Sequence, residues 1–208
     1  MSATKNEKQI KVILLGDSGV GKSCIINRYI IGLYDPNLES TLGSNASSKL
    51  IKKDRVSYIL NLWDTTGQEK YHSITNLFIK GSNIVILVYS IDSLSSFKGL
   101  DYWYKSVNEK LEGDNFVLAV VGSKSDLIEN QDEVVSEEEA KKFAKEKNAL
   151  FKLVSSKEDP DGINNLFESL LDELIKNNYL TENKSYVIDK RNHKDRGKRK
   201  KNKKNNCC

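Results

Sequence analysis

The sequence predicts an α/β fold of three layers, in which a mostly parallel six-stranded sheet is covered by helices on both faces. Short apolar runs alternate with segments of helical spacing, which is typical of parallel strands joined by crossover helices. Two of the runs, IVILVY at 84–89 and FVLAVV at 116–121, are continuously apolar, as expected for strands buried on both faces. Another two runs are separated only by Lys53-Asp54-Arg55, which predicts one antiparallel hairpin strand.

The first half of the chain supplies three strands and one helix. An apolar, β-rich run stops at Gly16, and the helical segment beyond the next loop ends near Gly32, a residue that suits a helix C-terminus. The hairpin strands lie on either side of Lys53-Asp54-Arg55. In order, we expect a strand at 11–15, a helix at 24–31, and strands at 48–52 and 56–63.

The second half contains a strand followed by a helix three times. Apolar residues of 94–111 recur at helical spacing between two buried runs. Ser136 precedes Glu139 by three residues, which is the signature of a capping box and predicts a helix that begins there and continues to about Lys147. In order, we expect a strand at 84–89, a helix at 94–111, a strand at 116–121, a helix at 136–147, a strand at 150–154 and a helix at 163–175.

Length and composition indicate one globular domain with a basic tail. The 208 residues are 38% hydrophobic and 30% charged, which provides for one core and excludes a wholly disordered chain. Apolar content collapses after about Thr181, so we expect a domain at 1–180 and a disordered tail at 181–208. Residues 190–208 contain ten Lys or Arg and one Asp, whereas residues 1–189 have a net charge of −5. The tail therefore favours an anionic partner, either a membrane surface or a nucleic acid.

Three further features limit the class of protein. No run of 18 apolar residues occurs, so we expect no helix that spans a membrane. The N-terminal residues lack the apolar stretch of a secretory signal. Three cysteines are too few for a disulfide framework, which fits a reducing compartment.

Residues 16–23, GDSGVGKS, match the phosphate-loop pattern G-x-x-x-x-G-K-[ST] between a buried strand and a helix. The glycines let backbone N–H groups wrap a polyphosphate, Lys22 supplies a positive charge to the β and γ phosphates, and Ser23 offers a hydroxyl to Mg²⁺. We therefore predict a nucleotide site, although this loop does not separate ATP from GTP. Its predicted nucleotide-binding residues are Ser18, Gly19, Val20, Gly21, Lys22, Ser23 and Cys24. We also expect the Cys24 side chain to be a small core residue.

The segment WDTTGQE, at 63–69, ends the third expected strand. Asp64 can hold Mg²⁺ through water, Gly67 can donate a backbone N–H to the γ-phosphate, and Gln68 can orient an attacking water. We therefore predict that Gln68, Lys22 and Gly67 are catalytic residues of a hydrolase.

Two later loops favour guanine. SKSD, at 123–126, follows the fifth strand, and the Asp126 carboxylate can accept both N1–H and the exocyclic amine of guanine, which adenine cannot match. Ser155-Ser156-Lys157 follows the sixth strand and can present a backbone N–H to guanine O6. Because loops at the carboxyl ends of parallel strands converge on a ligand crevice, the predicted ligands are GTP and GDP.

With these motifs in place, the chain resembles the Ras-like small GTPases, and within them the Rab branch, from about 8 to 177 and at its C-terminus. The resemblance rests on GDSGVGKS, TLG at 41–43, WDTTGQE, SKSD, SSK and the final Cys-Cys. It implies the fold of a P-loop G domain. It also implies that Thr41 completes the Mg²⁺ ligands Ser23 and Asp64, that Tyr34 lies at the edge of the guanine, and that the stem of Lys124 covers the base.

The resemblance further implies a molecular switch that acts in vesicle trafficking. GTP and Mg²⁺ would order the loops around Thr41 and 67–76, and slow hydrolysis, assisted by a GTPase-activating protein, would release them. The other implied partners are a guanine nucleotide exchange factor, a GDP-dissociation inhibitor, a Rab escort protein, a geranylgeranyl transferase and effectors of unknown identity that bind the two switches. We expect a monomer on the cytoplasmic face of intracellular membranes that cycles with the cytosol.

The chain departs from the family pattern at four places. Thr66 stands where the family has Ala, and its β-branched side chain could either crowd the water held by Gln68 or restrict the flip of Gly67. Ser123 replaces Asn, which should remove amide hydrogen bonds to the base and to the phosphate loop. Ser156 replaces Ala, a mild change because the backbone makes the contact. Ser44-Asn45-Ala46 replaces Val-Asp-Phe, so effector identity does not carry over. The remaining aromatic residues of the usual effector surface, Trp63 and Phe78, form either an exposed patch or part of the core.

The last two residues, Cys207 and Cys208, resemble the double-cysteine end of Rab proteins, which implies two geranylgeranyl groups. Two lipids give stable anchoring where one gives marginal anchoring, and the basic tail adds attraction to an anionic leaflet. A solvated tail with a chance pair of cysteines, or a nuclear-import or RNA-binding tail, is the alternative.

Three functions follow as hypotheses. The first is a Rab-type GTPase. The second is a guanine-nucleotide binding module with little or no hydrolysis, which Thr66 and Ser123 favour and Gln68 opposes. The third is a nucleic-acid-associated GTPase that uses the tail, although the basic stretch KRKKNKK, at 198–204, lacks an aromatic residue for base stacking.

Overall fold

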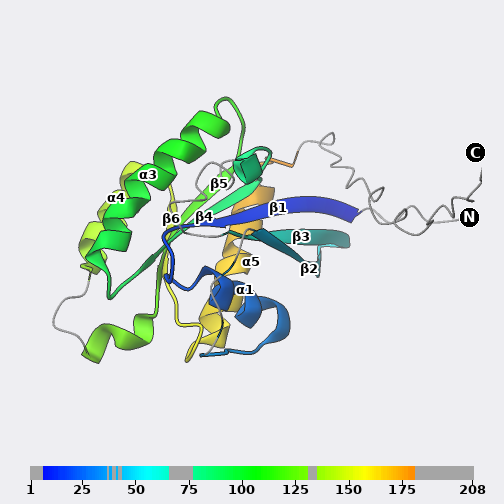
Figure 1. Ribbon diagram of the computed structural model, residues 1–208. Helices are drawn as coiled ribbons and strands as arrows, with labels where there is room; N and C mark the ends of the chain where they lie inside the picture. The colour runs from blue at the N-terminus through cyan, green and yellow to red at the C-terminus, as the bar shows by residue number, and fades with distance from the viewer. Residues whose placement is uncertain are drawn as a thin grey trace, which may run out of the picture.

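A six-stranded sheet in the order β2-β3-β1-β4-β5-β6 organises the chain (Figure 1). The structure is a computed structural model that describes residues 7–36, 38, 41, 44–65, 77–130 and 135–180. β2 pairs with β3 in antiparallel fashion, and every other neighbouring pair is parallel. The strands are β1 (Glu7–Leu15), β2 (Ser44–Lys53), β3 (Val56–Thr65), β4 (Ile84–Ser90), β5 (Val117–Ser123) and β6 (Leu150–Leu153). The predicted α/β class and the single antiparallel hairpin are confirmed.

Helices cover both faces of this sheet (Figure 1). They are α1 (Lys22–Ile31), α3 (Leu94–Lys110), α4 (Glu137–Glu146) and α5 (Pro160–Lys176), with the short 3-10 helix η2 (Ser125–Asn130). Alternate residues of β1 divide between the two layers, as the period of a strand requires. Val12 and Leu14 pack with α1 and α5, whereas Ile13 and Leu15 pack with α3 and α4.

Several predicted boundaries are short by a few residues. β1 begins at Glu7 rather than at 11, because its parallel pairing with β3 extends to Glu7 beside Ser57 even where its side chains are exposed. α1 begins at Lys22 rather than at 24, directly after the left-handed Gly21. α5 begins at Pro160 rather than at 163, because Asp159 caps its N-terminus by accepting the Gly162 N–H.

The hairpin turn is shorter than the sequence predicts. Lys53 pairs with Val56, so only Asp54 and Arg55 remain in the turn. Both have positive φ, 50° and 66°, the backbone conformation of a two-residue turn that matches the twist of the flanking strands. Ser136 meanwhile caps α4 as predicted by accepting the Glu139 N–H at 3.4 Å.

Several sequence predictions fall outside the described residues, namely those on Leu42, Gly43, the segment 66–76 and the tail 181–208. Within the described ranges, every helix is too short or too polar to cross a membrane.

Candidate nucleotide-binding site

The loops that contain most of the described site residues lie at the carboxyl ends of the parallel strands. The helix after β1 packs on one face of the sheet and the helix after β4 packs on the other, so the chain diverges between these adjacent strands. Ligands of open α/β sheets bind at such a point of divergence. The phosphate loop follows β1, and the two loops expected to read the base follow β5 and β6.

Glycine geometry shapes the phosphate loop. A Cβ on Gly16 would lie 2.1 Å from the Val88 carbonyl oxygen, so the loop leaves β1 packed directly against β4. Gly19 and Gly21 have φ values of 76° and 93°, which side chains rarely allow. These turns allow successive backbone N–H groups to converge on an anion at the N-terminus of α1.

Lys22 is enclosed by this loop. Its Nζ donates hydrogen bonds to the carbonyl oxygens of Gly16, at 2.8 Å, and Asp17, at 2.7 Å, and the residue is only 5% exposed. Burial lowers the pKa of Lys22 to about 8, and the nearby Asp64 and Asp17 carboxylates only partly oppose that effect. A polyphosphate here would supply the negative charge that a buried ammonium lacks.

Three oxygen-bearing side chains meet beside the loop. The Ser23 hydroxyl lies 2.7 Å from Thr41 Oγ1, which donates to Asp64 Oδ2 at 2.9 Å. Because Thr41 has one hydroxyl proton, Ser23 must be the donor of the first bond. The other carboxylate oxygen, Asp64 Oδ1, is buried and has no hydrogen-bond partner.

These residues fit Mg²⁺. Its preferred ligands are oxygens, and it is usually held by one or two carboxylates together with substrate phosphates. An unpartnered carboxylate oxygen beside two hydroxyls supplies that kind of donor set. Among the residues that the structure describes, no group of three or more His, Cys, Asp or Glu could hold a metal on its own. The arrangement therefore suits a cation that arrives with a phosphate ligand.

The two base-reading loops contact each other. Ser155 Oγ donates to Asp126 Oδ1 at 2.5 Å and accepts the backbone N–H groups of Lys157, at 3.2 Å, and Glu158, at 3.0 Å. Ser155 is 2% exposed, so this hydroxyl is a fixed link between the loops after β5 and β6. The link orients the Asp126 carboxylate that the sequence assigns to guanine.

Ser123 keeps one contact that its shorter side chain was predicted to lose. Its hydroxyl lies 2.5 Å from the Val20 carbonyl oxygen in the phosphate loop and 2.9 Å from that of Tyr89 on β4. The expectation of a lost hydrogen bond to the loop is therefore wrong, because the shorter side chain still reaches Val20. A hydroxyl has only one proton for these two acceptors, whereas an amide has two. The lost contact to the base stays a prediction.

Two long-range contacts of the site were not predicted from the sequence. Arg28, on α1, donates to the carbonyl oxygens of Ser156, at 2.6 Å, and Lys157, at 2.9 Å, and so braces the loop expected to contact guanine O6. Trp103, on α3, donates its indole N–H to Asp17 Oδ1 at 3.0 Å. A buried indole needs an acceptor, which is the one signal that the sequence contains for the second contact.

Other predicted residues lie at the margin of the site. Tyr34 is 37% exposed on the segment after α1, so its ring is open to solvent. Cys24 is half-buried rather than enclosed in the core, so the prediction of a core residue is wrong. Its partial burial still raises the pKa of the thiol. Gly67 and Gln68 fall outside the described residues.

Trp63 and Phe78 are neither fully exposed nor fully buried, so they combine the exposed patch and the core position that the sequence left open. Their rings stack with centroids 5.2 Å apart, and both side chains are half-buried against the core between the sheet and α3 and α4. Ala46 lies beside Trp63 on the neighbouring strand, where a larger side chain would extend this aromatic surface.

Comparison with known proteins places this site in a family. A sequence model of the Ras family matches residues 11–176. The chain is 39% identical to Ras-related protein Rab-11B of Dictyostelium discoideum over 175 residues, which cover 82% of this chain and 78% of that protein. It is 34% identical to Ras-related protein Rab-18 of Caenorhabditis elegans, with 84% of each chain covered, and 34% identical to Ras-related protein SEC4 of Saccharomyces cerevisiae, with 82% and 79% covered. The family match spans every strand and helix that contributes to the nucleotide site, and the chain thus belongs to the Ras family of small GTPases, with Rab proteins among its relatives.

Proposed function

We propose that this protein is a Rab-type switch that binds GTP and GDP with Mg²⁺, hydrolyses GTP and acts in vesicle trafficking. The observation that carries the proposal is the meeting, at one edge of the sheet, of an enclosed lysine, an oxygen cluster and a carboxylate suited to guanine. Lys22 supplies the first, Ser23, Thr41 and Asp64 the second, and Asp126 the third.

Each group has a separate task in this mechanism. Lys22 and the loop N–H groups neutralise and orient the phosphates, and Asp126 selects guanine over adenine. Ser23, Thr41 and Asp64 would hold Mg²⁺, which supplies charge stabilisation at the β and γ phosphates when it is bound. Gln68 orients the attacking water, and Gly67 donates a backbone N–H to the γ-phosphate. Catalysis rests on positioning and on charge stabilisation, because little covalent chemistry is required of the protein.

Thr41 gives the switch its physical basis. The structure holds its hydroxyl against Ser23 and Asp64, on the segment between α1 and β2. A γ-phosphate and cation would favour this position, and loss of the γ-phosphate would remove that preference. Partners that read this segment would then distinguish the GTP form from the GDP form, as effectors, exchange factors and GTPase-activating proteins require.

Membrane attachment completes the proposal. We assign the domain to 1–180 and the basic tail to 181–208, with geranylgeranyl groups on Cys207 and Cys208. An escort protein and a transferase would attach these lipids to the cysteines. Extraction by a GDP-dissociation inhibitor would then let the protein cycle between intracellular membranes and the cytosol.

Competition against a fluorescent GDP analogue tests the nucleotide assignment. GTP and GDP should displace the analogue while ATP should not, Lys22→Ala should abolish binding, and Asp126→Asn should shift preference toward xanthine nucleotides. Equal affinity for ATP and GTP would contradict the proposal.

A binding module with little hydrolysis is the second candidate, because Thr66 adds a β-branched hydroxyl beside Gly67. Single-turnover hydrolysis separates the two candidates. A slow GTPase should turn over GTP as the unaltered protein, and faster with a GTPase-activating protein, should lose turnover in Gln68→Leu and keep or gain it in Thr66→Ala. A binding module should show no turnover as the unaltered protein, with or without the activating protein.

A further inference from the structure

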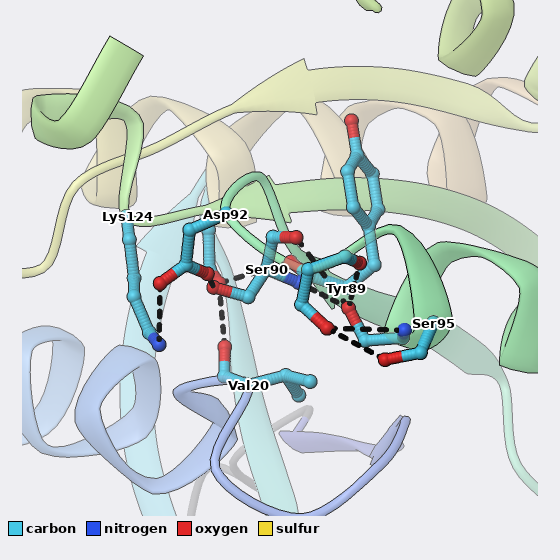
Figure 2. Close-up of polar contacts among 9 residues, drawn as sticks. Val20, Tyr89, Ser90, Asp92, Ser95 and Lys124 are labelled. Atoms are coloured by element: carbon cyan, nitrogen blue, oxygen red, sulfur yellow. Dashed lines mark hydrogen bonds and ion pairs between the residues drawn. The ribbon is translucent and has the colours of Figure 1, made fainter. Parts of the chain in front are cut away.

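Asp92, in the loop between β4 and α3, lies beside the lysine expected to cover the guanine base. Its Oδ2 is 3.5 Å from Lys124 Nζ (Figure 2). The two side chains are 22% and 39% exposed, respectively, so the pair is partly shielded from water. Neither the phosphate loop nor the base-reading motifs contain Asp92.

The Asp92 carboxylate is itself held in place. Ser90 Oγ donates to Asp92 Oδ1, so one oxygen faces Ser90 while the other faces Lys124. Ser90 is 2% exposed, and its backbone N–H donates to Ser96 Oγ at 3.0 Å. Its carbonyl oxygen accepts the Ser93 N–H at 3.0 Å, which closes the turn that contains Asp92. The carboxylate therefore belongs to a rigid turn rather than to a loose surface loop.

Lys124 needs such a partner. It has a φ of 59°, and it begins the loop directly after β5. Ser90 and Ser123 are register partners on β4 and β5, so Asp92 and Lys124 leave adjacent strand ends. A free lysine stem samples many rotamers and must give up that freedom to lie along a base. An ion pair at Nζ restricts the stem before any nucleotide arrives.

We propose that Asp92, oriented by Ser90, is a positioning residue of the guanine site that holds Lys124 ready for the base. This inference rests on the proposed binding of guanine nucleotides. It gives the chain a means to offset the base contact that Ser123 is expected to lack. Asp92 thus slows nucleotide release without touching the nucleotide.

The direction of the change in nucleotide binding distinguishes a positioning role of Asp92 from a purely electrostatic one. A carboxylate near a polyphosphate repels it, so removal of the charge should tighten nucleotide binding if Asp92 acts only through its field. Removal of a positioning residue should weaken binding instead. The two explanations therefore predict opposite changes in the same variant.

Release of a fluorescent GDP analogue, measured by stopped flow, tests the proposal. Asp92→Asn preserves shape and should accelerate release about threefold to tenfold, the range expected for a partly buried ion pair and its hydrogen bond. Asp101→Asn, an exposed carboxylate on α3, is the matched control and should leave release unchanged. Ser90→Ala should accelerate release less than Asp92→Asn does.

A double-mutant cycle assigns the effect to Lys124. Lys124→Met keeps an unbranched stem but removes the charge, so Asp92→Asn should add no further acceleration in that background. Unchanged or slower release in Asp92→Asn, or an equal acceleration in the Lys124→Met background, would overturn the inference. Failure of the unaltered protein to bind the analogue would instead overturn the proposed function.

Discussion

At the scale of single residues, burial controls the charge of Lys22. Its ammonium is surrounded by loop carbonyls and has a pKa of about 8, below the ordinary value of 10.5. The unfolded chain therefore binds more protons than the folded chain between these two pH values. Since stability rises with pH wherever the unfolded state binds more protons, this lysine makes the free protein more stable as pH increases from 8 toward 10.5.

We expect urea unfolding of the nucleotide-free protein to record this dependence. The contribution of Lys22 to the free energy of unfolding should grow by on the order of 1–3 kcal/mol across that interval. Lys22→Met removes the titrating group and should lose that part of the increase. Parallel pH profiles for the two proteins would show that the lysine is not desolvated.

Arg28 is the second residue whose contacts have a measurable consequence. It donates to three carbonyl oxygens, those of Gly32, Ser156 and Lys157, from a planar fork that lysine cannot reproduce. Arg28→Lys should therefore lower the free energy of unfolding by about 1–3 kcal/mol, the range for lost hydrogen bonds to a charged group. Chemical denaturation measures the change, and Lys105→Ala, on the exposed face of α3, provides a control that should differ from the native chain by less than about 0.5 kcal/mol. An unchanged free energy of unfolding in Arg28→Lys would show that these hydrogen bonds do not stabilise the loop after β6.

At the scale of elements, the β2–β3 hairpin is closed by one unfavourable residue. Asp54 and Arg55 both adopt positive φ, where glycine, asparagine and aspartate are favoured and an arginine is strained. β2 is also one of the two edge strands of the sheet and has β3 as its one neighbour, so its pairing depends on this turn. Lys53 adds an ion pair to Asp172 on α5, which ties the hairpin end to the helix layer.

Arg55→Gly should stabilise the protein. Relief of the left-handed strain should exceed the extra chain entropy of glycine and raise the free energy of unfolding by about 0.5–1 kcal/mol. Arg55→Val should lower it, because a branched side chain fits this conformation worst. Thermal melts of both variants beside the native chain provide the measurement, and the reverse order of stability would contradict the turn geometry.

At the scale of the whole molecule, the sequence was sufficient where a feature is local. Continuous apolar runs identified β4 and β5, and the spacing of GDSGVGKS identified the loop that leads into α1, although the helix begins at Lys22 rather than at 24. The contacts that brace the site join residues far apart in the chain. Ser123 and Val20 are separated by 103 residues, and Arg28 and Ser156 by 128. Local periodicity and spacing contain no information on such pairs, so their partners became visible only in the folded structure.

The basic tail leads to a prediction about membrane attachment. Replacement of both Cys207 and Cys208 by serine should leave the protein soluble, because each buried lipid methylene contributes about 0.8 kcal/mol. Neutralising Lys198, Arg199, Lys200 and Lys201 should weaken or redirect attachment without full release, since each charge contributes only about 1 kcal/mol near an anionic surface. Fractionation of cells at physiological salt compares the variants. A double-serine variant that still sediments with membranes would refute the lipid anchor.

The contact between Trp103 and Asp17 gives the protein an optical property. The chain has two tryptophans, and only the indole of Trp103 donates to the phosphate loop. Indole emission depends on the charge and hydrogen bonding at the ring nitrogen, so a nucleotide that shifts Asp17 should change the intensity or wavelength of this light. In a Trp63→Phe background, the fold would contain a single tryptophan, whose emission follows the occupancy of the loop without any added label.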